Sequence, residues 1–107
     1  MNLEDFATTI SALSIPAVYG YYSESISVPY AAYSVSLRNA IHADGIVVYA
    51  ESWCTLVLVT RHRDLTSEAA IEKLLTDNGI SFGDPSYEWD EEHGIHIATY
   101  YFQLEEE

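Results

Sequence analysis

The stretch that decides the fold is Val28–Thr60, which reads VPYAAYSVSLRNAIHADGIVVYAESWCTLVLVT. It opens with Pro-Tyr and ends in a long apolar run. Ile46–Thr60 is strand-like over its whole length, which is long for one strand. Small and polar residues at Ala50–Ser52 predict a bulge or bend there. The polar segment LRNAIHADG before this run is expected to be a loop that connects two strands.

The strand predicted at Ile46–Thr60 is apolar on both faces. Successive side chains alternate between the faces of a strand, and a half-exposed strand carries polar residues on one of them. One face of this strand would carry Cys54, Leu56 and Leu58, and the other Trp53, Thr55, Val57 and Val59. We therefore expect that both faces are covered within one chain, or that another chain covers one of them.

Two helices are predicted on either side of this stretch. The first has Asn2 as its cap and an apolar stripe from Leu3 to Leu13 at helical spacing, and Pro16 ends it. The second lies in DLTSEAAIEKLLTDNGI. Thr66 is its expected N-cap, and Gly79 its expected left-handed C-terminal residue.

Further strands complete the pattern. AVYGYY at 17–22 and YAAYSVSL at 30–37 are rich in strand-forming residues, and SYEWD and GIHIATYYFQL are joined by the acidic turn EEHG as a hairpin. The predicted fold class is α+β: an antiparallel sheet of about four to five strands with two helices packed on it, in the order α-β-β-β-α-β-β. We expect a single domain, 1–107, with an acidic C-terminal tail at 105–107.

The charge of the chain restricts its partners. Seventeen carboxylates against four Lys and Arg give a formal net charge of -13. Phosphate neutralisation needs Lys and Arg, so we expect no specific nucleic-acid binding and no attachment to anionic membranes. The single cysteine, Cys54, is expected to be a buried free thiol. No signal peptide or membrane-spanning segment is visible, which favours synthesis and use in the cytosol.

Candidate chemical groups are weak throughout the sequence. His42 and Asp44 are two residues apart, as are His62 and Asp64, but a metal site needs three or four ligands. His93 and His96 follow a run of acids, yet the expected turn at Gly94 separates them. There is no Gly-rich phosphate loop and no nucleophile motif. We therefore predict no enzyme activity, no catalytic residue, no metal ligand and no cofactor.

The order of the short motifs resembles a known family. AVYGYY, VPYAAY, ADG, the long strand ending LVLVT, SEAAIEKLLTDNGI and YEWDEEHGIHIATYYF follow one another across nearly the whole chain. This order is similar to that of the small head–tail connector and tail completion (tail terminator) proteins of siphophages and their prophages. In that family a Pro-Tyr strand, an Ala-Asp turn, a lysine-bearing helix that ends in Gly-Ile and a C-terminal hairpin occur in the same sequence.

The resemblance implies a structural subunit of a virion. Such subunits form a ring, commonly a hexamer, at the head-proximal end of the tail, where they contact tail-tube and head-connector proteins and DNA passes through the lumen. The family has no catalytic residues to transfer. The implied location is the tail or neck of the virion, and the host bacterial cytoplasm before assembly.

A ring requires two different patches on each subunit. We expect the interface to include an apolar strand face, a basic segment and an acidic hairpin. The candidate interface residues are Trp53, Val57, Val59, Arg61, Arg63, Glu88, Asp90, Glu91 and Glu92. The candidate residues of a loop that faces the lumen or the next ring are Arg38, Asn39, His42 and Asp44.

A different class of function also suits so acidic a chain. A DNA-mimic inhibitor of a host nucleic-acid-binding defence protein displays carboxylates in place of phosphates. The positions of the acids distinguish the two hypotheses, because a mimic needs them along one continuous face. In this sequence they gather in the predicted hairpin turn, the tail and the first helical turn.

Overall fold

The computed structural model describes residues 3–20, 28–43 and 45–106 of the 107-residue chain, with side chains described outside 37–43, 47–51 and 105–106. The proposed cap Asn2, and Asp44 in the middle segment, lie outside these residues. Two helices and five strands follow one another in the predicted order. They are α1 (Leu3–Ile10), β1 (Ala17–Tyr19), β2 (Tyr30–Ala43), β3 (Ile46–Thr60), α2 (Leu65–Asp77), β4 (Ser86–Asp90) and β5 (Ile95–Glu106).

The strands form one sheet in the order β1-β2-β3-β5-β4. Three of its four strand pairs are antiparallel, and the short edge strand β1 pairs with β2 in parallel, with Ala17 opposite Ala31. The α+β prediction is therefore confirmed, with the sheet mixed rather than wholly antiparallel. Parallel pairing requires a crossover connection, which a local pattern of apolar residues does not reveal.

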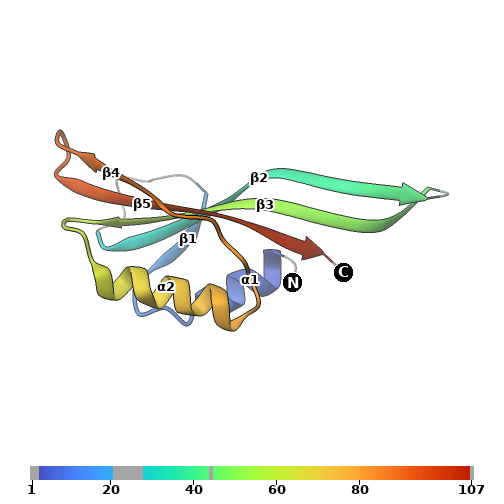
Figure 1. Cartoon of the computed structure of the whole chain (residues 1–107), viewed down its shortest axis with the longest axis horizontal. Coiled ribbons are helices and arrows are strands. Elements are labelled where there is room, and N and C mark those ends of the chain that lie inside the picture. Colours follow the sequence, from blue (N-terminus) through green and yellow to red (C-terminus); the bar gives the residue numbers. More distant parts are fainter. Residues whose placement is uncertain (1–2, 21–27, 44, 107) are drawn as a thin grey trace.

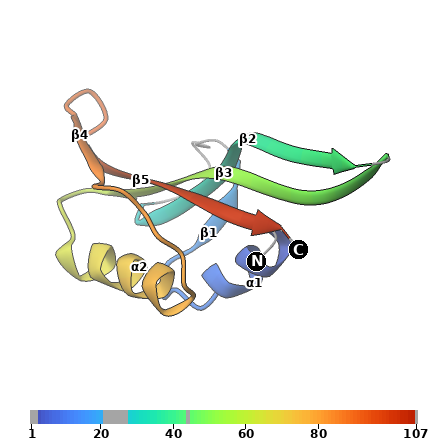
Figure 2. The same ribbon diagram turned by 45° about the vertical axis from the view of Figure 1, so that its right-hand side comes forward.

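Both helices lie against the same face of the sheet (Figures 1 and 2). Phe6 and Ile10 of α1 and Ile71 and Leu75 of α2 are fully buried because they pack on that face. The sheet contributes alternate residues of its three central strands, as period-two alternation requires. These are Ala31 and Tyr33 of β2, Cys54, Leu56 and Leu58 of β3, and Ala98, Tyr100, Phe102 and Leu104 of β5.

Helix α2 begins at a different cap from the predicted Thr66. Asp64 is the N-cap: its carboxylate accepts a hydrogen bond from the Ser67 N–H at 3.1 Å and another from the Ser67 hydroxyl at 2.8 Å. The predicted C-terminal end is confirmed. Gly79 has a φ of 71°, and the Ile80 N–H donates to the Leu75 carbonyl at 2.9 Å, which is the Schellman arrangement.

The segment LRNAIHADG is not a loop, and this is the main correction to the predicted elements. Residues 37–43 continue β2 and pair with β3, so that β2 and β3 form one long hairpin that extends well beyond the helices (Figure 1). Polar residues such as Arg38 and Asn39 suggested a loop, but a strand without a helix against it carries no apolar stripe to identify it.

Two smaller corrections concern register and the C-terminus. The irregularities between β2 and β3 fall at Val35–Leu37 and Ile41–His42, and not at Ala50–Ser52 as predicted. They leave Ser36 on β2 and Val48 on β3 without an opposite residue in the pairing of the two strands. The Ser36 hydroxyl donates to the Trp53 carbonyl at 3.0 Å. The acidic tail predicted at 105–107 is shorter, because Glu105 and Glu106 continue β5 opposite β3.

Candidate subunit interface

The face of the sheet that points away from the helices carries a second apolar cluster, and we call it the open face. Tyr30, Ala32 and Val59 are buried there, with Val57 and Ile95 half-buried against them. None of the helices or strands in the described ranges packs over this face. β3 is therefore apolar on both sides, as predicted. The helices cover one side, and the other side forms part of the open face.

Two adjoining hollows shape the open face. One has a volume of about 310 Å³ and is lined by β2, β3 and Gly20, and the other has a volume of about 290 Å³ and lies towards the β4–β5 hairpin. Tyr30, Val57 and Val59 line both of them, so the two hollows adjoin near the centre of the sheet. Mainly apolar side chains around a concave surface are typical of a contact surface.

The open face continues along β3 towards the far end of the hairpin. Trp53 has the same strand parity as Val57, and its side chain is 42% exposed. Tyr101 of β5 pairs with Thr55 and is more than half exposed. Exposed aromatic residues beside an apolar centre are common in protein–protein interfaces. Trp53, Val57 and Val59, three of the predicted interface residues, therefore lie on one continuous surface.

Acidic residues border this surface at one end. Glu88 and Asp90 of β4 pair with Ile97 and Ile95 of β5, and Asp90 lines the second hollow. Glu91 and Glu92 follow in the exposed turn. His93 Nδ1 lies 2.8 Å from Asp90 Oδ2, and this hydrogen bond lowers the pKa of Asp90 below its ordinary value. The predicted acidic hairpin is thus the rim of the apolar face.

The same turn holds a group of residues that could bind a metal ion. Ligand atoms of Asp90, Glu92 and His93 lie within 4.8 Å of one another. Glu92 and His93 are exposed, and the hydrogen bond between His93 and Asp90 already accounts for their proximity. His96 is not part of this group, because its ring stacks on Tyr87, as expected for a residue on the other side of Gly94.

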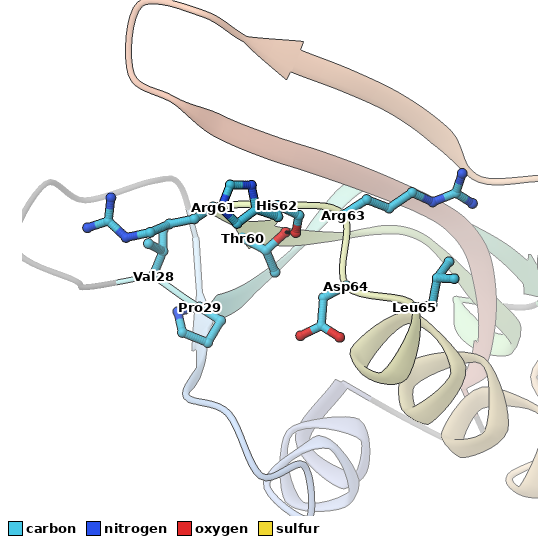
Figure 3. Close-up of a pocket in the computed structure, with 8 residues that line it drawn as sticks. All are labelled: Val28, Pro29, Thr60, Arg61, His62, Arg63, Asp64 and Leu65. Atoms are coloured by element: carbon cyan, nitrogen blue, oxygen red, sulfur yellow. Dashed lines mark hydrogen bonds between the residues drawn. The ribbon is translucent and has the colours of Figure 1, made fainter.

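The two arginines that were predicted to act together are separated by the structure. They border a shallow hollow of about 500 Å³ at the end of β3, where their side chains extend in opposite directions (Figure 3). Arg61 is exposed and has no ion-pair partner among the described residues. Asp64 in the same segment is engaged as the α2 cap, and that engagement lowers its pKa.

Arg63 belongs to an intramolecular cluster on the helix side of the sheet. Its guanidinium carbon lies 4.4 Å from the centre of the Tyr87 ring, and its Nε lies 3.4 Å from Glu68 Oε2. Burial, and then the Glu68 carboxylate, raise the pKa of Tyr87. Arg63 therefore joins α2 to β4 within the chain.

Glu68 is the residue that sequence reasoning missed. Its side chain is only 4% exposed, although it is a carboxylate. The signal was present, since Glu68 precedes the buried Ile71 by three residues and Leu75 by seven, which places it on the buried stripe of α2. Burial first, and then the carboxylates of Glu72 and Glu68, raise the pKa of the neighbouring Tyr100.

The remaining predicted site residues lie in the β2–β3 hairpin. Arg38, Asn39 and His42 are in β2, opposite Ser52, Glu51 and Val47, while Asp44 lies outside the described residues. Cys54 is a buried free thiol, as expected. No helix in the described part of the chain is long and apolar enough to cross a membrane.

Comparison with known proteins adds no assignment. No protein-family model matches the chain, and a search of curated proteins found no significant match. The geometry of the open face and of the hairpins therefore has to support any functional proposal.

Proposed function

We propose that this chain is a structural subunit of a phage or prophage tail, namely the tail terminator or tail completion protein. It would form a ring, of hexameric size, at the head-proximal end of the tail and join the tail to the head connector. The observation that carries the proposal is the open face: an apolar, concave sheet surface around Tyr30, Val57 and Val59 on a chain whose helices all pack on the other side.

The arrangement of patches supports a ring more than a symmetric dimer. A ring joins one patch of a subunit to a different patch of the next, whereas a two-fold dimer joins a patch to itself. An apolar open face, an exposed Arg61 and an acidic turn at Glu91 and Glu92 are three different surfaces on one chain. Arg61 is the residue we propose for the contact with a neighbour's acidic turn, since Arg63 is engaged within the chain.

The acidity of the chain fits a channel that conducts DNA without binding it. A net charge of -13 repels phosphates, so DNA in the lumen would slide rather than adhere. A DNA mimic would instead need its carboxylates along one face. Most of the described carboxylates are divided between the first turn of α1, helix α2 and the β4–β5 hairpin, and the broad open face is apolar. This distribution favours assembly over mimicry.

Loss of the gene tests the proposed function. A stop codon early in the reading frame, in the phage or prophage that carries it, should yield heads without attached tails and tails of uncontrolled length by electron microscopy. Synonymous recoding of the same codons is the matched control and should leave particles normal. Complete, joined particles of normal tail length from the stop-codon genome would rule out a tail terminator.

A further inference from the structure

The end of the β2–β3 hairpin is a two-stranded arm, which we define as residues 41–43 and 45–49. β5 accompanies β3 only as far as Ala50, which pairs with Glu106. Beyond that point β3 pairs, among the described strands, with β2 alone, through the pairs Ile41–Tyr49, His42–Val47 and Ala43–Ile46. The hairpin projects beyond the helices and the rest of the sheet (Figures 1 and 2).

This arm is not expected to be stable without a packing partner. A two-stranded hairpin is marginally stable in water unless one of its faces is packed against something. The arm sequence is nevertheless apolar, with Ile41, Val47, Val48 and Tyr49, and Ile46 at the start of β3 is 67% exposed. Natural proteins seldom leave an apolar hairpin in water, because it invites association. We therefore expect the arm to pack against a surface outside its own chain.

The open face offers a surface of the matching kind. Its two hollows meet at Tyr30, Val57 and Val59, and a strongly apolar wall surrounds them. In the single chain the arm exposes Ile46, and the open face exposes Trp53 and Tyr101 beside the half-buried Val57. Contact between the two would remove this apolar surface from water. Burial of apolar surface gives roughly 25 cal/mol per Å², so contact between the two is favourable for both.

The arm cannot reach the hollows of its own chain. Tyr49 and Val57 are eight residues apart along β3, and a strand rises about 3.3 Å per residue, so roughly 26 Å separate them along a continuous strand. The strand between them is held in the sheet by unbroken pairing with β5 from Ala50 to Thr60. An arm that packs on an open face therefore belongs to a second copy.

We propose that the arm of each subunit packs on the open face of the next subunit. The arm and the face are different surfaces, so the contact is head-to-tail and can close into a ring. The proposal deepens the proposed function and rests on its self-assembly. It places His42 at the boundary between subunits, in place of the lumen or inter-ring position expected from the sequence, while Arg38 and Asn39 precede the arm on β2.

Two complementary variants separate the two halves of the contact. The armless variant replaces residues 41–49 by Asn-Gly, which joins the paired residues Ala40 and Ala50 through a two-residue hairpin turn. The face variant is Val57→Lys, which puts a charge at the junction of the two hollows. Ile46→Glu provides a second arm variant that keeps the full chain, and Ala70→Lys on the exposed side of α2 is the control for added charge.

Light scattering on these proteins, alone and mixed, is the test. The wild type and Ala70→Lys should form the same oligomer, whereas the armless, Ile46→Glu and Val57→Lys proteins should each be folded monomers by circular dichroism. An equal mixture of the armless and Val57→Lys proteins should give a species of two subunits, because one retains the face and the other the arm.

Three results would overturn the arm-to-face contact. They are a wild type that stays monomeric at every concentration, an armless or Ile46→Glu protein that still forms the wild-type oligomer, and variants that lose assembly but do not pair when mixed. The second and third leave the tail function standing, since a ring could form through other surfaces. Normal particles from the stop-codon genome would instead reject the tail function and leave the arm-to-face contact intact.

Discussion

Glu68 is a carboxylate at a position where the stripe of α2 calls for an apolar side chain. Burying a charge is costly unless a partner compensates it. The described partner is Arg63, whose guanidinium also covers the Tyr87 ring. Because Arg63 is 53% exposed, solvent weakens the pair, and the arginine acts mainly by keeping Glu68 from being buried without a counter-charge.

Replacing Arg63 should therefore destabilise the monomer. We expect Arg63→Ala to lower the free energy of unfolding by about 1–3 kcal/mol, the usual cost of a buried acceptor that has lost its partner. Urea denaturation measures it. Arg61→Ala is the matched control, since Arg61 is exposed and unpaired among the described residues, and should change stability by less than about 0.5 kcal/mol. Equal effects of the two substitutions would show that the Glu68 contact is unimportant.

The Asp64 cap gives the chain a defined response to acid. Hydrogen bonds from Ser67 hold the pKa of Asp64 below its ordinary value of 3.8. The capping contribution is then complete above that value, and it declines as the pH falls through the lower pKa of the folded chain. Asp64→Ala should be less stable than the wild type at pH 6, and the difference in thermal midpoint should narrow below pH 4. A difference that stays constant down to pH 2 would contradict the charged cap.

At the scale of elements, α2 ends where one glycine permits it. Gly79 has a φ of 71°, a conformation that L-residues adopt only at a cost, and the Ile80 N–H closes the helix on Leu75. Gly79→Ala should lower the free energy of unfolding by about 1 kcal/mol in urea denaturation. Gly83→Ala is the matched control, because Gly83 has no positive φ and open space around it. If the control costs as much, the helix end is not the cause.

The elements also show which parts of the fold the sequence could predict. Both helices and β5 were predictable because their apolar stripes pack on a core of the same chain. The acidic turn EEHG indicated the β4–β5 hairpin. Residues 37–43 of β2 were not predictable, since polar residues such as Arg38 and Asn39 interrupt the apolar pattern that identifies a strand. The predicted cap Thr66 was wrong by two residues, because Thr and Asp both cap helices and only the backbone shows that Asp64 does so here.

At the scale of the whole molecule, the sheet has two unequal faces. The helix-side core explains why the chain folds, and the open face explains why it should not remain alone. The apolar residues of both faces could be read from the alternation along β3. The separation of Arg61 from Arg63 could not be predicted from the sequence, because it depends on the direction in which each side chain extends from the loop (Figure 3).

The solution mass of the purified wild-type protein is the most direct test of a self-assembling ring. Light scattering across a concentration series should give one discrete species, of about 72 kDa for a hexamer, six times the subunit mass of 12.0 kDa. The same series on Val57→Lys should give the subunit mass. A wild type that remains at 12.0 kDa at every concentration would contradict the central claim.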